Sequence, residues 1–302
     1  EEGFRKAIES FQAAIDMDPN YALAYAGLAD CYTLLPAWAL SAPADAHPRA
    51  RAAAEKALAL DPTIAEAHAA LAHTQHNFEW DWAGAERSYR KAIELNPNYA
   101  IAHHWYGNLL SDLGRTEESL AEKKRALQLD PLSLVINADY GNMLYMARRY
   151  DEAARQLSVT LELDPQFILA HEFLGFTYQA QKKYPQALGE LNKALALSPQ
   201  SPETLAELGY VEALAGNVSE AEAYLKKVQA LSARRYVVAF DVAMLYSGLN
   251  RKPEALDWLE KAMDERSYQV TSLNVDPRVD SLRSEPRFAQ LVRRLGLPER
   301  NR

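Results

Sequence analysis

The chain has little of what disulfide-stabilised, nucleic-acid-binding and membrane-spanning proteins need. Its 302 residues include one cysteine, Cys31, which excludes an internal disulfide and a multi-cysteine metal site. Lys and Arg number 33 against 41 Asp and Glu, and the net charge of -8 has the wrong sign for a general nucleic-acid binder. The sequence has no run of about eighteen apolar residues, which is the length that a membrane-spanning helix needs. These absences exclude three broad classes of protein.

Sequence motifs of catalysis are absent as well. The chain has no glycine-rich phosphate loop, no HExxH, no CxxC and no GxSxG nucleophile elbow. We therefore expect no enzyme activity and no cofactor. Glycine is scarce at 12 residues, whereas Ala, Leu, Glu and Lys are abundant, and this composition favours helix throughout.

What the sequence does contain is a repeated unit of helix, short polar turn, helix and stop. The stops follow one another at intervals of 34 or 35 residues, and one earlier stop precedes them by 43: Asp18-Pro19, then Asp61-Pro62, Asn96-Pro97, Asp130-Pro131, Asp164-Pro165 and Ser198-Pro199. A single helical pair cannot bury the apolar faces of both helices. The copies must therefore stack on one another to form a core.

Small residues recur at fixed places within the units. The first helices carry Gly or Ala at Ala29, Ala72, Gly107, Gly141, Gly175, Gly209 and Ala243, and the second helices carry Ala153, Ala187, Ala221 and Ala255 twelve residues later. A large side chain at these places would separate the two helices of a pair.

The unit from Ile168 to Pro199 resembles a tetratricopeptide repeat, whose period is 34 residues. It has His171, Leu174, Gly175 and Tyr178 in its first helix, Ala187, Leu191 and Ala194 in its second, and Pro199 at its end. The resemblance covers roughly residues 1–263 and implies an all-α fold, a right-handed α-α superhelix with a C-terminal capping segment. Four residues depart from the family pattern: Lys123, Thr160, Glu212 and Ala233.

The period divides the chain into an array at 1–263 and a capping segment with a helix at 264–302. The array has a half repeat at 1–21 and repeats that start near residues 22, 65, 100, 134, 168, 202 and 236. The half repeat lacks a first helix, so we expect the sequence to come from a longer polypeptide. In the capping segment, apolar residues from Leu273 to Leu282 are expected to lie across the last repeat, before a helix from Pro286 to Gly296.

This tail, with the HHW and EWDW segments, is similar to the C-terminal repeat regions of multidomain bacterial regulators. Those proteins carry an N-terminal winged-helix, protein-kinase or adenylate-cyclase domain. The resemblance implies a bacterial cytoplasmic location, or a periplasmic one if a preceding part of the protein carries a membrane span.

In a tetratricopeptide superhelix the first helices line the concave side, and residue spacing then predicts the lining of a peptide-binding groove. The candidates are His73, His104, Asn108, Asn142, Phe176, Tyr210, Phe240 and Met244. Asn108 and Asn142 offer both donors and acceptors to the backbone of an extended peptide. The aromatic residues and Met244 could accept apolar side chains. The alternative is that these residues only coat a solvated or self-packed surface.

The groove positions include no Lys or Arg, unlike tetratricopeptide domains that clamp the terminal carboxylate of a chaperone peptide. We therefore expect a protein or peptide partner that is apolar with some basic character, with no nucleic acid bound by this region and no membrane insertion.

Two other interpretations stay open. The repeats could mediate self-association within a signalling enzyme or transcription factor whose active domain is absent. A weaker alternative is a small-molecule or metal sensor that uses His73, His76 and His104. No carboxylate or cysteine is obviously placed to complete a metal site, so we expect none, and an ordinary polar lining is the simpler interpretation.

Overall fold

The chain folds into helical pairs that stack into a superhelix, and the computed structural model describes residues 2–38 and 40–297. The first helices are α2 (Ala22–Leu34), α4 (Ala65–Thr74), α6 (Ala100–Asp112), α8 (Leu134–Met146), α10 (Ile168–Ala180), α12 (Pro202–Ala215) and α14 (Ala239–Gly248). The second helices are α1 (Glu2–Met17), α3 (Pro43–Leu60), α5 (Trp82–Leu95), α7 (Thr116–Leu129), α9 (Tyr150–Leu163), α11 (Tyr184–Leu197), α13 (Val218–Ser232) and α15 (Lys252–Asp264). No β-strand occurs in the described ranges, and the predicted all-α superhelix is confirmed.

Second helices end where the sequence predicts a stop. Helices α5, α7 and α9 end at Leu95, Leu129 and Leu163, and each is followed by Asn-Pro or Asp-Pro. Proline lacks a backbone N–H and restricts the residue before it, so the helix cannot continue through the pair. These stops place each new first helix at the same point of its unit.

The recurring small residues hold the two helices of a pair close together. A Cβ atom placed on Gly141 would lie 2.6 Å from Cγ of Leu157, and one on Gly175 would lie 2.8 Å from Cγ of Leu191. Ala153 and Ala187, in the second helices, are fully buried. The helices therefore approach closely because these positions carry almost no side chain.

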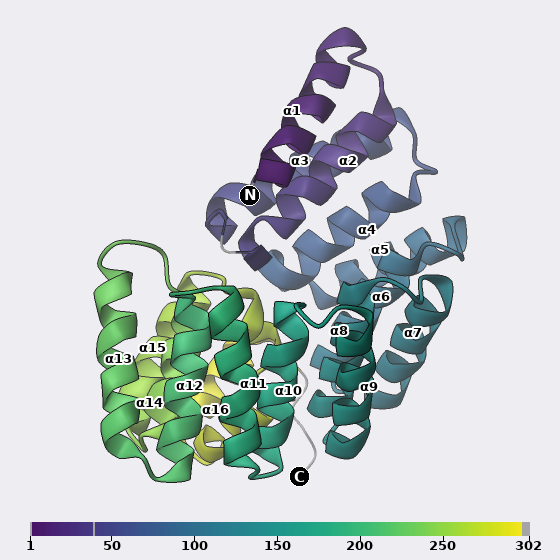
Figure 1. The fold of residues 1–302 in the computed structure, drawn as a ribbon. Helices are drawn as coiled ribbons and strands as arrows, with labels where there is room; N and C mark the ends of the chain where they lie inside the picture. The colour runs from purple at the N-terminus through teal and green to yellow at the C-terminus, as the bar shows by residue number, and fades with distance from the viewer. Residues whose placement is uncertain (1, 39, 298–302) are drawn as a thin grey trace.

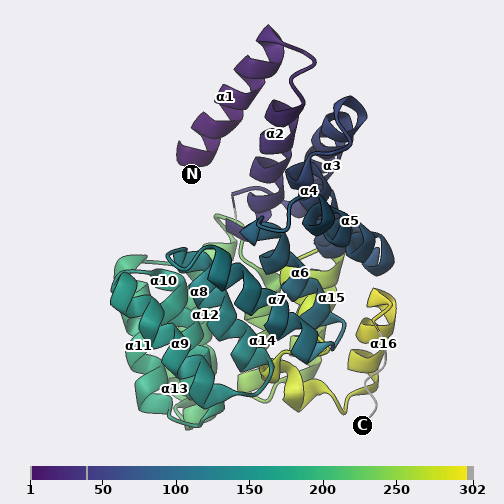
Figure 2. The same ribbon diagram turned by 90° about the vertical axis from the view of Figure 1, so that its right-hand side faces the viewer.

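The C-terminal part adds two short 3-10 helices, η3 (Tyr268–Ser272) and η4 (Pro277–Leu282), and then α16 (Pro286–Leu295). Helix α16 packs on α15, and its last turn also meets an early repeat, because Nε1 of Trp82 donates to the carbonyl of Leu295 at 2.8 Å. Figures 1 and 2 show α1 and α2 extending away from the group of later helices, with α16 beside that group. The N-terminal repeats thus form an arm, and the later repeats form a body that the C-terminal part joins.

Among the helices that the structure describes, none combines the length and apolar character that crossing a bilayer requires.

Candidate functional site

The first helices form the inner face of the superhelix. Helix α2 contacts α4, and the contacts continue from α4 to α6, from α6 to α8 and from α8 to α10, with α12 against α14. A row of first helices in mutual contact is what creates the concave side of such a solenoid. We call this surface the concave face.

Part of the concave face is covered by the chain itself. Residues 266–283, which we call the crossing segment, follow α15 and contact α14, α15, α6 and the π-helical turn η2 (Gln75–Glu79). Four of its aliphatic residues are fully buried and belong to the same core as Tyr210, Phe240 and Met244: Val270, Leu273, Val279 and Leu282. The segment therefore covers more than the last repeat, because it extends over the inside of the superhelix.

Arg278 is the central contact of the crossing segment. Its guanidinium pairs with Glu207 of α12 and with Asp276, whose Oδ2 is 2.8 Å away. It also lies over two rings, 4.7 Å from the centroid of Phe176 and 5.1 Å from that of Phe240. Burial raises the pKa of Glu207, and Arg278 opposes this rise. A buried arginine between a carboxylate and aromatic faces uses both its charge and its planar shape.

Three other contacts fix the edges of the crossing segment. Arg148, which follows α8, donates two hydrogen bonds to Asp280 at 2.7 and 2.8 Å. The hydroxyls of Ser247 and Ser281 lie 2.8 Å apart. Arg266 donates to a carbonyl of η2 and lies 3.7 Å from the ring centroid of Trp80. The segment is thus connected to repeats that are far apart in the sequence.

The predicted groove residues lie at different depths. Tyr210 is 6% exposed, while Phe240 and Met244 are 0% exposed, because they pack in the core that includes the crossing segment. Phe176 is half-buried beneath the guanidinium of Arg278. The structure therefore brings these four residues together, and the chain's own segment lies over them.

The two asparagines lie farther along the same face and are half-buried. Asn142 forms a hydrogen bond with Asp139. A role of the two asparagines in recognising a peptide stays a prediction.

The predicted groove histidines lie among aromatic and charged neighbours. His73 is half-buried, with its ring centroid 4.7 Å from Trp105 and 6.1 Å from His47. His104 is buried near Lys123 and has its pKa lowered to about 3, chiefly by burial. His76 of η2 bonds Asp112 at 2.8 Å. Within the described ranges, no three or more His, Cys, Asp or Glu side chains are arranged to hold a metal ion.

The N-terminal half of the concave face stays accessible. Leu23 at the start of α2 is 54% exposed and Val135 at the start of α8 is 41% exposed. Ile101 occupies the same place in α6 and is half-buried. These residues recur at the second position of their helices, where α4 carries Glu66, and we call the three apolar members the entry row: Leu23, Ile101 and Val135.

Carboxylates accompany this accessible surface. Burial, together with the charge of Glu66, raises the pKa of Asp30 to about 7. In α10, burial raises the pKa of Glu172 to about 7; a hydrogen bond from Thr204 opposes the rise, and Glu203 adds to it. In both cases burial is the largest cause, because it disfavours the charged form of a carboxyl. The concave face therefore combines apolar side chains with carboxyl groups, and the predicted groove positions include no Lys or Arg.

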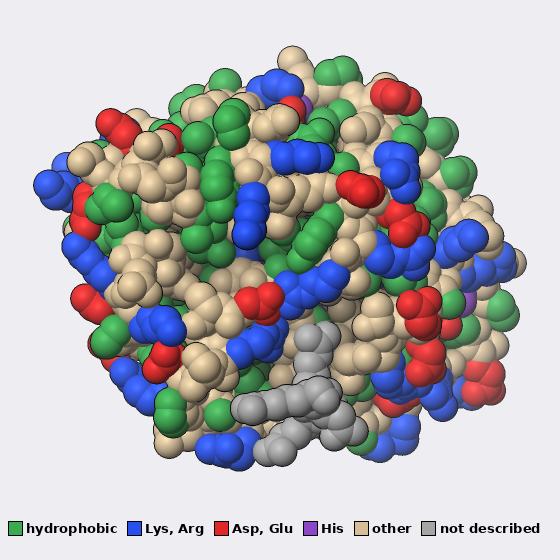
Figure 3. Space-filling view, turned by 90° about the horizontal axis from the view of Figure 1, so that it is seen from below, with side chains coloured by type: hydrophobic (Ala, Val, Ile, Leu, Met, Phe, Trp, Pro, Cys, Tyr) green, Lys and Arg blue, Asp and Glu red, His purple; other side chains and the backbone are tan. Residues whose placement is uncertain are grey.

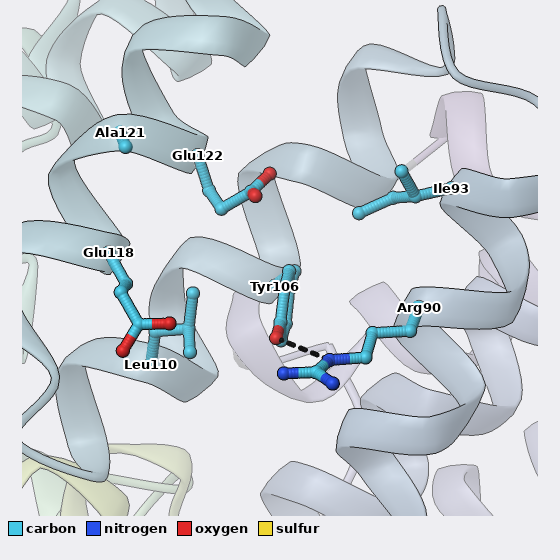
Figure 4. A pocket seen from close by; sticks show the side chains of 7 residues that line it. All are labelled: Arg90, Ile93, Tyr106, Leu110, Glu118, Ala121 and Glu122. Carbon is cyan, nitrogen blue, oxygen red and sulfur yellow. Dashed lines mark hydrogen bonds between the residues drawn. The ribbon is translucent and has the colours of Figure 1, made fainter.

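An open pocket of about 360 Å³ lies elsewhere, between α5, α6 and α7, and contains none of the predicted groove residues. Figure 4 shows Arg90 pointing at Tyr106 inside it. Nε of Arg90 donates to the Tyr106 hydroxyl at 3.0 Å, and that hydroxyl donates to Glu86 at 2.9 Å. Figure 3, a view from below, shows Lys and Arg side chains interspersed with Asp and Glu side chains on the face in view. Neither feature defines a site as clearly as the concave face.

Sequence spacing missed the charged centre of the concave face. Glu207 and Asp241 are buried on α12 and α14, Asp241 directly after the predicted Phe240, and burial raises the pKa of both. Arg278 lies in a segment without helical periodicity. The available signal was an arginine between two aspartates in an otherwise apolar stretch.

Three family models of the tetratricopeptide repeat match the chain, at residues 88–121, 178–235 and 1–46. No curated protein matches the sequence. A chain of the APC/C hetero-tetramer Cut9-Hcn1 has a TM-score of 0.64 at 18% identity, and the match covers 82% of this chain and 46% of that one. This chain therefore spans less than half the length of that relative.

Two further solved structures are similar. A monomeric mutant of IFIT1 with Gppp-AAAA has a TM-score of 0.66 at 16% identity, covering 87% of this chain and 68% of that one. The Pseudomonas aeruginosa pilF protein has a TM-score of 0.51 at 22% identity, covering 68% and 92%. At these identities the likeness shows the fold. The three matched segments are similar to tetratricopeptide repeats, and the helical pairs of the chain stack as a solenoid.

Proposed function

We propose that this chain is a non-enzymatic scaffold whose concave face binds a protein segment that carries apolar side chains and positive charge. The observation that carries the proposal is the environment of Arg278. This basic residue comes from an apolar stretch and lies between Glu207 and the rings of Phe176 and Phe240. The crossing segment thus has the chemistry that we expect of a partner. An acidic face repels acidic segments and attracts basic ones.

The entry row is the part of the concave face that a partner reaches first. Leu23 and Val135 are largely exposed, and Asp30 and Glu66 lie along the same row of helices. An extended or helical segment could place apolar residues on the row and a Lys or Arg near the two carboxylates. Asn108 and Asn142 lie on the same face and could bond the backbone of that segment.

The repeats are also proposed to form part of a larger bacterial regulator. The two tryptophans of the EWDW segment contact the tail, since Trp82 bonds the carbonyl of Leu295 and Trp80 stacks on Arg266. The segments that carry the resemblance therefore form one contact region, which supports treating them as one unit.

The first prediction concerns the entry row. A variant with Leu23→Ala, Ile101→Ala and Val135→Ala should bind partner segments at least tenfold more weakly, because it loses apolar contact area on the accessible face. The measurement is binding of an array of fluorescent peptides that are apolar and either basic or acidic. Basic peptides should bind the parent chain more tightly than acidic ones.

The matched control removes apolar side chains from second helices. Val159→Ala, Leu163→Ala and Leu197→Ala change residues that are 45%, 44% and 37% exposed, and this variant should bind as the parent does. Both variants must keep the parent's helical circular dichroism. Equal binding by all three proteins, or a preference for acidic peptides, contradicts the proposal. A dimer in light scattering that the entry-row variant disrupts would favour self-association.

A further inference from the structure

The crossing segment has the features of a bound ligand rather than of a repeat. Its only regular structure is η3 and η4, and it holds its own shape through local bonds. Arg283 donates to the carbonyls of Leu273 and Asp276, both at 3.1 Å, and the Asp276 side chain accepts from the backbone N–H of Arg278 at 2.8 Å. A segment that is organised before it binds loses less conformational entropy on binding.

The segment also uses the surface that the sequence predicts for a partner. Arg278 contacts side chains from three first helices, Phe176 of α10, Glu207 of α12 and Phe240 of α14. Two of these residues are predicted groove residues. The contact therefore takes place where a peptide would bind in trans.

The fit between segment and face is incomplete. Oε2 of Glu207 and the hydroxyl of Tyr145 are buried and have no protein hydrogen-bond partner, although both groups interact electrostatically with Arg278. Buried polar atoms without such partners weaken an interface. A segment that offered a donor to Glu207 and an acceptor to Tyr145 would bind this surface more tightly than the chain's own residues do.

We propose that the crossing segment is a displaceable occupant of the concave face, and that a partner segment with an arginine next to aspartate in an apolar stretch takes its place. This inference rests on the proposed function and extends it from the entry row to the centre of the face. Because the crossing segment is tethered, its high effective concentration keeps weak ligands out. The segment thereby selects for partners that make the same arginine contact with better complementarity.

The test uses the full chain and a fluorescent peptide with the sequence of residues 267–283. An Arg278→Ala chain, whose own segment has lost its main contact, should bind this peptide at least tenfold more tightly than the parent chain does. A peptide that carries the same Arg278→Ala change should bind the variant chain at least tenfold more weakly than the unchanged peptide does. The control chain is Arg287→Ala, which removes an arginine that pairs with Asp257 and Glu260 on α15. It should bind the peptide as the parent does.

Hydrogen exchange on the parent chain gives an independent readout. The amides of the crossing segment should exchange through local opening, at least tenfold faster than the amides of α10, α12 and α14. If Arg278→Ala reduces helicity, the milder Asp280→Ala, which removes the pairs with Arg148 and with Arg283, replaces it in the binding test.

Two results overturn the inference: exchange of the crossing segment at the rate of the surrounding helices, or equal peptide binding by the parent and the released variants. Either would make the segment a permanent part of the core. The proposed function would survive that outcome, because the entry row lies on α2, α6 and α8 and is tested with different variants and peptides.

Discussion

At the scale of single residues, Lys123 shows how the solenoid accommodates a charge at an apolar position. It is fully buried in α7, and its Cγ would lie 2.8 Å from a Cβ on Gly107, so its alkyl chain fills the space beside that glycine. Its amine pairs with Asp139 and lies 3.4 Å from Nδ1 of His104. Burial lowers the pKa of Lys123, and Asp139 opposes this effect. The charge is tolerated because the aspartate compensates for it.

Removing the lysine alone should therefore be costly. Lys123→Met keeps the volume but leaves Asp139 without its cation, and we expect a loss of about 3 kcal/mol in the free energy of unfolding. The double variant Lys123→Met with Asp139→Asn should recover most of that loss. Lys193→Met, at a lysine that is 60% exposed, should change stability by less than about 0.5 kcal/mol. Urea unfolding followed by circular dichroism measures the stability of these three variants. If Lys123→Met were as stable as the parent, the pair of Lys123 and Asp139 would contribute nothing to stability.

The buried carboxyl groups show what spacing could predict. The repeat pattern identifies which side of a first helix faces inward, and it led to Phe240 among the groove candidates. Asp241 follows Phe240 directly, and one residue turns a helix by only about 100°. Spacing therefore identified the face, but it could not determine which of two adjacent side chains carries the charge. That depends on partners from other repeats.

At the scale of elements, each helical pair depends on its closest approach. Gly141→Ala in α8 places a methyl group 2.6 Å from Leu157. We expect this overpacking to lower the free energy of unfolding by about 1 to 3 kcal/mol. The better helix propensity of alanine should offset up to about 1 kcal/mol of that loss. Gly189→Ala in α11 meets nothing within 4 Å and should stabilise the chain by about 0.5 to 1 kcal/mol. Thermal unfolding compares the two. If the Gly141 variant had the same melting temperature as the Gly189 variant, the two helices of the pair could separate without a loss of stability.

The helical pairs could be predicted from sequence because they combine a 3.6-residue period, a small residue at a fixed place and, in most repeats, an Asp-Pro, Asn-Pro or Ser-Pro stop after the second helix. The crossing segment has none of these local signals. Its apolar residues were predicted to cover the last repeat, and they do pack against α14 and α15. Its path across the concave face depends on Arg278 meeting Glu207 and on Asp280 meeting Arg148. Contacts between residues that are far apart in the chain leave no periodic trace in the sequence.

At the scale of the whole molecule, the C-terminal part changes how the repeats depend on one another. A simple solenoid is stabilised only by contacts between neighbouring repeats, so its ends can unfold separately. Here Trp82 of α5 donates to the carbonyl of Leu295, the last residue of α16, and Arg266 donates to the carbonyl of Phe78. These contacts connect early and late repeats, so the repeats from α5 onward should unfold together.

Two buried groups give this molecule opposite responses to pH. Glu172 has a pKa of about 7 in the folded chain against 4.5 as its ordinary value, so the folded state binds the proton more tightly. Its contribution to stability therefore rises as pH falls from 7 to 4.5. His47, stacked on Phe78 and near His73, has a pKa of about 4 against 6.5, because burial disfavours its charged form. The unfolded state binds that proton more tightly, so stability falls as pH drops from 6.5 to 4.

Because the two effects oppose each other, the parent chain should show little net change between pH 7 and 4.5 from these groups, and single variants should separate them. Relative to the parent, Glu172→Gln should gain stability at pH 8, by up to about 3 kcal/mol at 1.36 kcal/mol per pKa unit, and the gain should vanish near pH 4.5. His47→Gln should show the opposite pH dependence. Its stability relative to the parent should increase as pH falls from 6.5 to 4, because the variant lacks the histidine whose protonation favours unfolding. Urea unfolding at pH 8, 6 and 4.5 measures both. Parallel pH profiles for the parent and both variants would mean that water reaches these groups and that neither is desolvated as its position implies.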